Sequence, residues 1–224
     1  MRDQTGPLSN TRISATYAYD LTLTQNIRMS FGASAGIKSL QTDLSKIKLN
    51  DGTNDVGSVS NNSPDLSLGV YLYSNKFFVG LSAQNLIFTE INKSIFGLDK
   101  KYYKNNNYYS QHLFVQAGYV FAINELFSVI PSTMVKYAIN TPTPSVDLNA
   151  KVKYNNMLWA GINYRTNDAV GAFIGLLFDK KYEVSYAYDY GISNISIYGS
   201  GSHEIMIGYR IQPKFEVKSP SDYW

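Results

Sequence analysis

The chain contains two histidines, His112 and His203, so acid–base catalysis near neutral pH by an imidazole would depend on one of them. The run Ser202-His203-Glu204 places a hydroxyl, an imidazole and a carboxylate side by side, as a hydrolase would need. On an extended strand, however, neighbouring side chains point to opposite faces, so His203 and Glu204 cannot pair directly. We therefore predict no catalytic residue and no enzymatic activity, and we set aside a barrel enzyme.

Metal ligands are equally scarce. The chain has no cysteine, which excludes thiolate zinc sites, disulfide scaffolds and cysteine nucleophiles. Residues 51–55 resemble a calcium-binding loop, but the bidentate glutamate that should follow is missing. We expect no metal and no cofactor.

Charged side chains of both signs recur on the polar side of alternating segments. In 146–154, Asp147, Lys151 and Lys153 oppose an apolar face. A selective pore usually presents one sign of charge, so a mixed set favours a paired network that fills a lumen, with a diffusion channel as the alternative. The predicted lumen residues are Asp147, Lys151, Lys153, Arg165, Glu183, Asp189, Glu204 and Arg210.

The elements that position these side chains are predicted to be strands, because apolar and polar residues alternate with a period of two almost throughout. Tight polar turns join several of them, and no segment has a helical period. About eleven strands follow from this pattern: 11–20, 26–38, 65–73, 76–84, 111–122, 126–137, 146–154, 157–165, 169–178, 182–190 and 203–211.

Two all-β architectures fit this pattern: a soluble sandwich and an antiparallel transmembrane β-barrel. Strand length, tyrosines on the apolar faces, and short turns that alternate with long loops favour the barrel. Only 17% of the 224 residues are charged and the net charge is +3, so nucleic acid is not an expected partner. The longest apolar run, 169–178, is too short for a membrane-spanning helix.

An odd strand number conflicts with the even number usual in bacterial barrels. If the short turns face the periplasm, strand 11–20 would also begin outside the cell. We therefore expect 1–211 to be the C-terminal part of a barrel of about 14 strands whose signal peptide and first strands are missing. Residues 212–224 are expected to form a periplasmic tail.

Several motifs together resemble one family, the PorP/SprF outer-membrane proteins of type IX secretion. The resemblance lies in their order and spacing, since each motif alone is weak. They are 44–46, 50–52, 76–82, 147–150, 158–161, 164–165, 167–171, 186–190, 201–209 and 217–220. The last residues, 221–224, depart from the usual family ending.

This resemblance implies a non-enzymatic protein in the outer membrane of a Gram-negative bacterium, in contact with its lipid. It implies a role in the export or surface attachment of a large surface protein, such as a gliding-motility adhesin. Expected partners are that protein and the periplasmic, peptidoglycan-linked parts of the secretion machinery. A general porin is the alternative. Within the tail, Phe215, Tyr223 and Trp224 are candidates for docking on a periplasmic partner.

Overall fold

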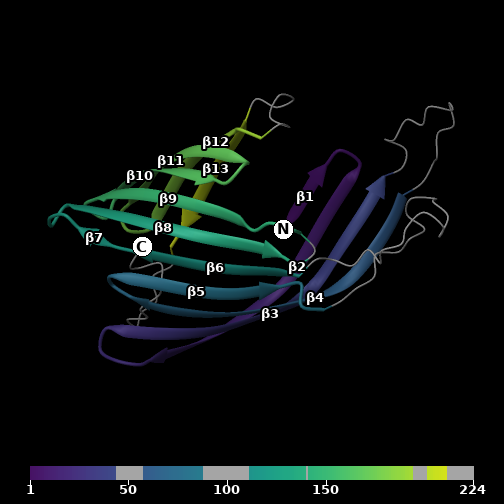
Figure 1. Cartoon of the computed structure of the whole chain (residues 1–224), viewed down its shortest axis with the longest axis horizontal. Helices are drawn as coiled ribbons and strands as arrows, with labels where there is room; N and C mark the ends of the chain where they lie inside the picture. Colours follow the sequence, from purple (N-terminus) through teal and green to yellow (C-terminus); the bar gives the residue numbers. More distant parts are fainter. Residues whose placement is uncertain (44–57, 88–110, 140, 194–200, 211–224) are drawn as a thin grey trace.

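The fold was established with a computed structural model that describes residues 1–43, 58–87, 111–139, 141–193 and 201–210. In these described ranges, thirteen strands form one sheet in which every pairing is antiparallel, and sequence neighbours are spatial neighbours (Figure 1). The strands are β1 (Arg2–Thr5), β2 (Leu8–Thr22), β3 (Ile27–Asp43), β4 (Ser58–Ser74), β5 (Phe77–Gln84), β6 (His112–Tyr119), β7 (Phe121–Ala122), β8 (Phe127–Ala138), β9 (Ser145–Tyr154), β10 (Leu158–Arg165), β11 (Ala169–Phe178), β12 (Tyr182–Gly191) and β13 (Ser202–Tyr209).

Every strand predicted from the sequence is present, and the all-β, antiparallel prediction is confirmed. The structure has thirteen strands rather than about eleven for two reasons. β1 has four polar residues and therefore no alternation to detect; it pairs with the start of β2 through a turn at Gly6, whose φ is +56°. In addition, the segment predicted as 111–122 is divided into β6 and β7.

The division between β6 and β7 lies opposite a proline. The backbone N–H of Val120 donates to the carbonyl oxygen of Lys76, on the β5 side, at 2.7 Å. Because successive residues of a strand direct their backbone groups to opposite neighbours, the N–H and C=O of Tyr119 point towards β8. The β6 and β7 registers place Pro131 opposite Tyr119, and proline has no N–H to donate. The ladder therefore breaks at this point and resumes in the same register at β7.

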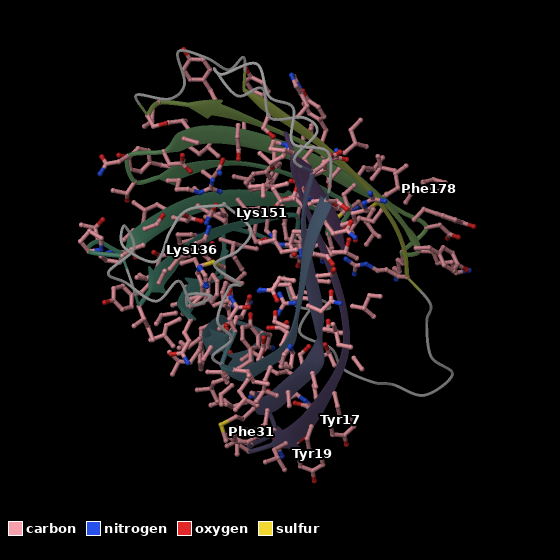
Figure 2. The ribbon with its side chains drawn as sticks, turned by 90° about the vertical axis from the view of Figure 1, so that its right-hand side faces the viewer. Tyr17, Tyr19, Phe31, Lys136, Lys151 and Phe178 are labelled. Carbon is pink, nitrogen blue, oxygen red and sulfur yellow. The ribbon has the colours of Figure 1, made fainter. Side chains whose placement is uncertain are left out.

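The exposure of the side chains is inverted relative to a soluble sandwich. Outward apolar residues are largely exposed, for instance Ile13 at 75% and Phe178 at 63%, whereas the buried apolar residues of the described part are Tyr73, Ile130 and Ala169. Figure 2 shows Tyr17, Tyr19, Phe31 and Phe178 pointing away from the curved sheet, with Lys136 and Lys151 on its concave side. A broad apolar exterior around a polar interior is the arrangement of a transmembrane β-barrel, and it excludes the sandwich.

Connections of two kinds lie at opposite ends of the sheet, which we name the turn end and the loop end. At the turn end, Asn155-Asn156 and Asp179-Lys180 have positive φ at both positions, as the central residues of type I′ turns require. At the loop end, long connections follow β3 and β5. No helix in the described part of the chain has the length and hydropathy needed to cross a membrane.

The strands β2, β3 and β4 are longer than their neighbours, with 15, 17 and 17 residues. β4 pairs with β5 only from Leu68 onwards, so its first part, together with the last part of β3, extends beyond the adjoining sheet at the loop end (Figure 1). The sequence prediction began β4 at residue 65 because the preceding residues are polar on both faces.

Candidate functional site

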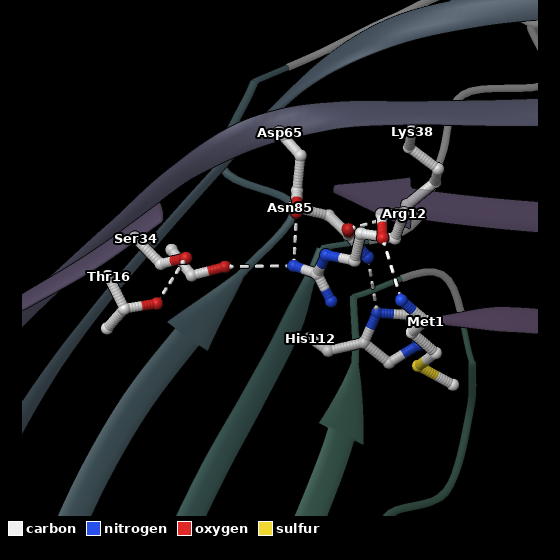
Figure 3. A network of polar contacts seen from close by, with 9 residues as sticks. Met1, Arg12, Thr16, Ser34, Lys38, Asp65, Asn85 and His112 are labelled. Carbon is white, nitrogen blue, oxygen red and sulfur yellow. Dashed lines mark hydrogen bonds and ion pairs between the residues drawn. The ribbon is translucent and has the colours of Figure 1, made fainter. Parts of the chain in front are cut away.

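The concave face of the sheet carries the charged residues, and their ion pairs gather near its two ends. At the loop end, Arg12 on β2 forms an ion pair with Asp65 on β4, and Arg12 Nη2 also donates to Ser67 Oγ at 3.3 Å (Figure 3). The Asp65 side chain is only 3% exposed, whereas that of Arg12 is 25% exposed. This pair joins β2 to β4 across β3, which lies between them.

A second group at the loop end links β8, β9 and β10. Lys136 Nζ lies 2.6 Å from Asp147 Oδ2, and Arg165 Nε lies 3.3 Å from Asp147 Oδ1. Arg165 also bonds Asp168 in the following turn, with 3.0 Å between Nη1 and Oδ2. One carboxylate is thus shared by two cations from the strands on either side.

At the turn end, Asp20 on β2 is the centre of a polar cluster. It accepts hydrogen bonds from Arg28 Nε at 2.7 Å, from Ser30 Oγ at 2.9 Å and from the hydroxyl of Tyr73 at 3.1 Å. The Tyr73 ring is 1% exposed, so the cluster is sealed on one side. Arg28 and Ser30 come from β3, and Tyr73 comes from β4.

Two of the ion pairs lie within the predicted lumen set. Asp147 pairs with Arg165, as above, and Glu183 accepts two bonds from Arg210, at 3.2 Å from Nε and 3.0 Å from Nη2. Lys151 and Lys153 project from the same face of β9. Within the described residues, neither has a carboxylate within 4.0 Å.

The remaining predicted residues are more scattered. Asp189 lies beside Asn163, over Gly171, and Glu204 is exposed on β13; neither belongs to an ion pair in the described part of the chain. The predicted docking residues Phe215, Tyr223 and Trp224 lie outside the described residues.

His203 points to the opposite face from Glu204. Its Nδ1 is 2.7 Å from the Tyr186 hydroxyl, and its ring is 4.8 Å from that of Tyr188. Among the described residues, no three His, Asp or Glu side chains are placed to hold a metal ion.

Sequence reasoning missed the clusters around Arg12 and Asp20. Alternation alone places both residues on the polar face of the predicted strand 11–20, so a signal was present. Their partners depend on how far one strand is shifted against the next, and the polar pattern does not contain that information.

The family described as type IX secretion system membrane protein PorP/SprF matches residues 1–209. The chain belongs to the PorP/SprF family. A comparison with curated proteins gives no match.

The family assignment agrees with the inverted exposure of the sheet. This PorP/SprF chain is therefore a membrane component of type IX secretion, and its strands present an apolar exterior to lipid. Its interior holds carboxylates and cations that bind each other across neighbouring strands. Because such pairs hold side chains of neighbouring strands in place, they make the polar face of the sheet rigid.

Proposed function

We propose that this PorP/SprF protein is an anchor in the outer membrane of a Gram-negative bacterium. It is needed for the export or surface attachment of a large adhesin-like protein, and it links that protein to the periplasmic secretion machinery. The observation that supports this most strongly is the family match over residues 1–209, combined with the lipid-facing exterior.

The proposed orientation follows from the connections. Outer-membrane barrels have short periplasmic turns and longer outer loops. The three-residue turns after β9 and β11 therefore face the periplasm, and the long connections after β3 and β5 face outwards. The loop end then meets the surface protein, and the turn end meets the machinery.

The predicted lumen set acts, in this proposal, as an internal network that stiffens the barrel. The two ion pairs Asp147–Arg165 and Glu183–Arg210 support this role for four of its members. The proposal extends it to Lys151, Lys153, Asp189 and Glu204.

A general porin is the second candidate, and one observation favours it. Lys151 and Lys153 line the concave face without a carboxylate within 4.0 Å among the described residues, as a path for anions would require. Planar bilayers separate the two functions. A porin gives stepwise conductance whose anion preference falls in the Lys151→Gln/Lys153→Gln double variant, whereas an anchor with a filled lumen gives none.

The tail is proposed to dock on a periplasmic partner through Phe215, Tyr223 and Trp224, which are apolar side chains next to the basic Lys214 and Lys218. Replacing Tyr223 and Trp224 by alanine should weaken recovery of periplasmic partners on affinity purification. The matched control is Ser219→Ala with Ser221→Ala, which shortens two polar side chains of the same tail and should leave recovery unchanged.

The secretion role is tested by removing the protein from the cells that make it. We expect the large surface protein to disappear from the cell surface and to return when the full chain is supplied. Unchanged surface levels of every large exported protein would overturn the proposal.

A further inference from the structure

A pocket of about 270 Å³ opens at the loop end of the concave face. Its wall includes Asn10, Arg12, Lys38, Asn85, His112 and Phe114, which come from β2, β3, β6 and the end of β5. Figure 3 shows Arg12, Lys38, Asn85 and His112 of this group. At about 30 Å³ per water molecule, this space equals roughly nine waters, enough for a small organic ligand. The secretion role described above makes no use of it.

The hydrogen bonds in the wall determine which atoms are donors. Lys38 Nζ lies 2.6 Å from Asn85 Oδ1, and because an ammonium only donates, the amide oxygen of Asn85 must face it. The amide nitrogen of Asn85 then donates to His112 Nδ1, 3.2 Å away. With Nδ1 as the acceptor, the imidazole hydrogen lies on Nε2, which is then a donor.

Asn85 is held in this position by an unusual backbone. Its φ is +56°, in the left-handed region that asparagine enters more readily than other non-glycine residues. This conformation ends β5 and turns the amide towards β3 and β6 together.

Arg12 leaves one donor unused. Its Nη2 binds Asp65 and Ser67, but its Nε is buried and has no hydrogen-bond partner in the described part of the chain. An unpaired buried donor is unfavourable, so an acceptor that reaches this position would stabilise the site. Asn10 Oδ1 is also buried and has no hydrogen-bond partner in the described part.

The charge of the wall selects the kind of acceptor. Arg12 and Lys38 are both cations, and among the described residues Asp65 is the carboxylate that acts on both. A carboxylate ligand is attracted to these two cations and accepts two hydrogen bonds at once. The rings of His112 and Phe114 lie nearly parallel, 6.3 Å apart with 20° between their planes, and add a flat aromatic side to the wall.

We propose that this pocket binds the carboxylate of a small acidic ligand, with Arg12, Lys38 and His112 as its donors. The Asn85 amide orients two of these three groups. The inference concerns a site for a small molecule and does not depend on the role in secretion.

The test is ligand-observed NMR on the folded full chain in detergent micelles, at constant ionic strength. The probes are glucuronate, which joins a carboxylate to a sugar ring, acetate, which is little more than the carboxylate, and glucose, which has the ring alone. We expect saturable binding of glucuronate and of acetate, and none of glucose.

Three variants locate the binding. Lys38→Met and His112→Phe should each weaken glucuronate binding by about tenfold or more, because each removes one bond to a charged group. Arg12→Lys retains the ion pair with Asp65 but lacks Nε, so it should also weaken glucuronate binding. Lys153→Gln removes a lumen cation near the turn end and should leave binding unchanged.

Fold is checked for each variant by its heat-dependent mobility on gels, so that a misfolded protein is not scored. Equal binding of glucose and glucuronate would overturn the proposal, as would the absence of saturable binding by both acids. Unchanged affinity in folded Lys38→Met and Arg12→Lys would overturn it too.

Discussion

The indole ring of Trp159 on β10 lies across Gly175, its register partner on β11. A Cβ added to Gly175 would stand 2.3 Å from both Cε2 and Cζ2 of the indole. Two residues away in the same pair of strands, Phe173 covers Gly161 in the opposite direction. The glycines on the concave face thus provide the space in which large aromatic rings lie flat against the sheet.

Gly175→Ala should lower the free energy of unfolding by about 1–3 kcal/mol, since the new methyl group overlaps the indole. In a Trp159→Leu background the same substitution should cost much less, because the overlapping ring is gone. A double-mutant cycle from urea unfolding in lipid vesicles measures the coupling. Gly208→Ala is the control: its Cβ would meet Glu183 Cβ at 3.5 Å, an ordinary contact. If Gly175→Ala proves as harmless as the control, the packing described here is wrong.

The Arg12–Asp65 pair should respond unequally to loss of its two partners. Arg12→Gln leaves the nearly buried carboxylate of Asp65 without a cation and should destabilise the fold by about 3–5 kcal/mol. Asp65→Asn leaves the Arg12 guanidinium, which reaches water, without its carboxylate, and should destabilise the fold clearly less. In the Asp20–Arg28 pair the side chains are 28% and 26% exposed, so Arg28→Gln and Asp20→Asn should cost similar, smaller amounts. Equal losses at the first pair would contradict this account; unfolding midpoints supply the comparison.

The sequence predicts where the strands lie and which face of each is polar, but not which side chains meet across neighbouring strands. Alternation located the strands and assigned Lys151 and Lys153 to the polar face, because a period of two is a local property. It missed β1, which has no apolar residue, and the break opposite Pro131, which depends on the neighbouring strand. Local pattern also placed Arg165 and Asp147 on one face without showing that Lys136 completes their group. That contact requires the register of three strands.

The outward face of β10 offers a test of lipid contact. Ile162 is 62% exposed near the middle of this strand. Ile162→Lys should destabilise the protein by about 2–4 kcal/mol in a bilayer, because a charge near the midplane is poorly solvated. Its neighbour Asn163 faces the concave side near Asp189, so Asn163→Lys is the matched control and should be tolerated. Folding titrations in vesicles compare the two; equal tolerance would show that this face does not meet lipid.

The turn after β11 contains a lysine in a glycine conformation. Lys180 has φ +54°, where a Cβ costs about 1–2 kcal/mol. Lys180→Gly should remove that strain at a smaller entropic cost and raise the free energy of unfolding by up to about 1 kcal/mol. Asn156→Gly, in the corresponding turn after β9 with φ +51°, should gain less because asparagine tolerates this region. A loss of stability on Lys180→Gly would show that the side chain has contacts that outweigh the strain.

The central claim is that a lipid-facing PorP/SprF sheet connects a surface protein to periplasmic secretion machinery. Mass spectrometry of proteins that co-purify with the native form, gently solubilised from outer membranes, tests it most directly. The account predicts recovery of peptidoglycan-linked periplasmic components together with one large surface protein. A lone barrel that conducts ions in planar bilayers would contradict it and favour the porin.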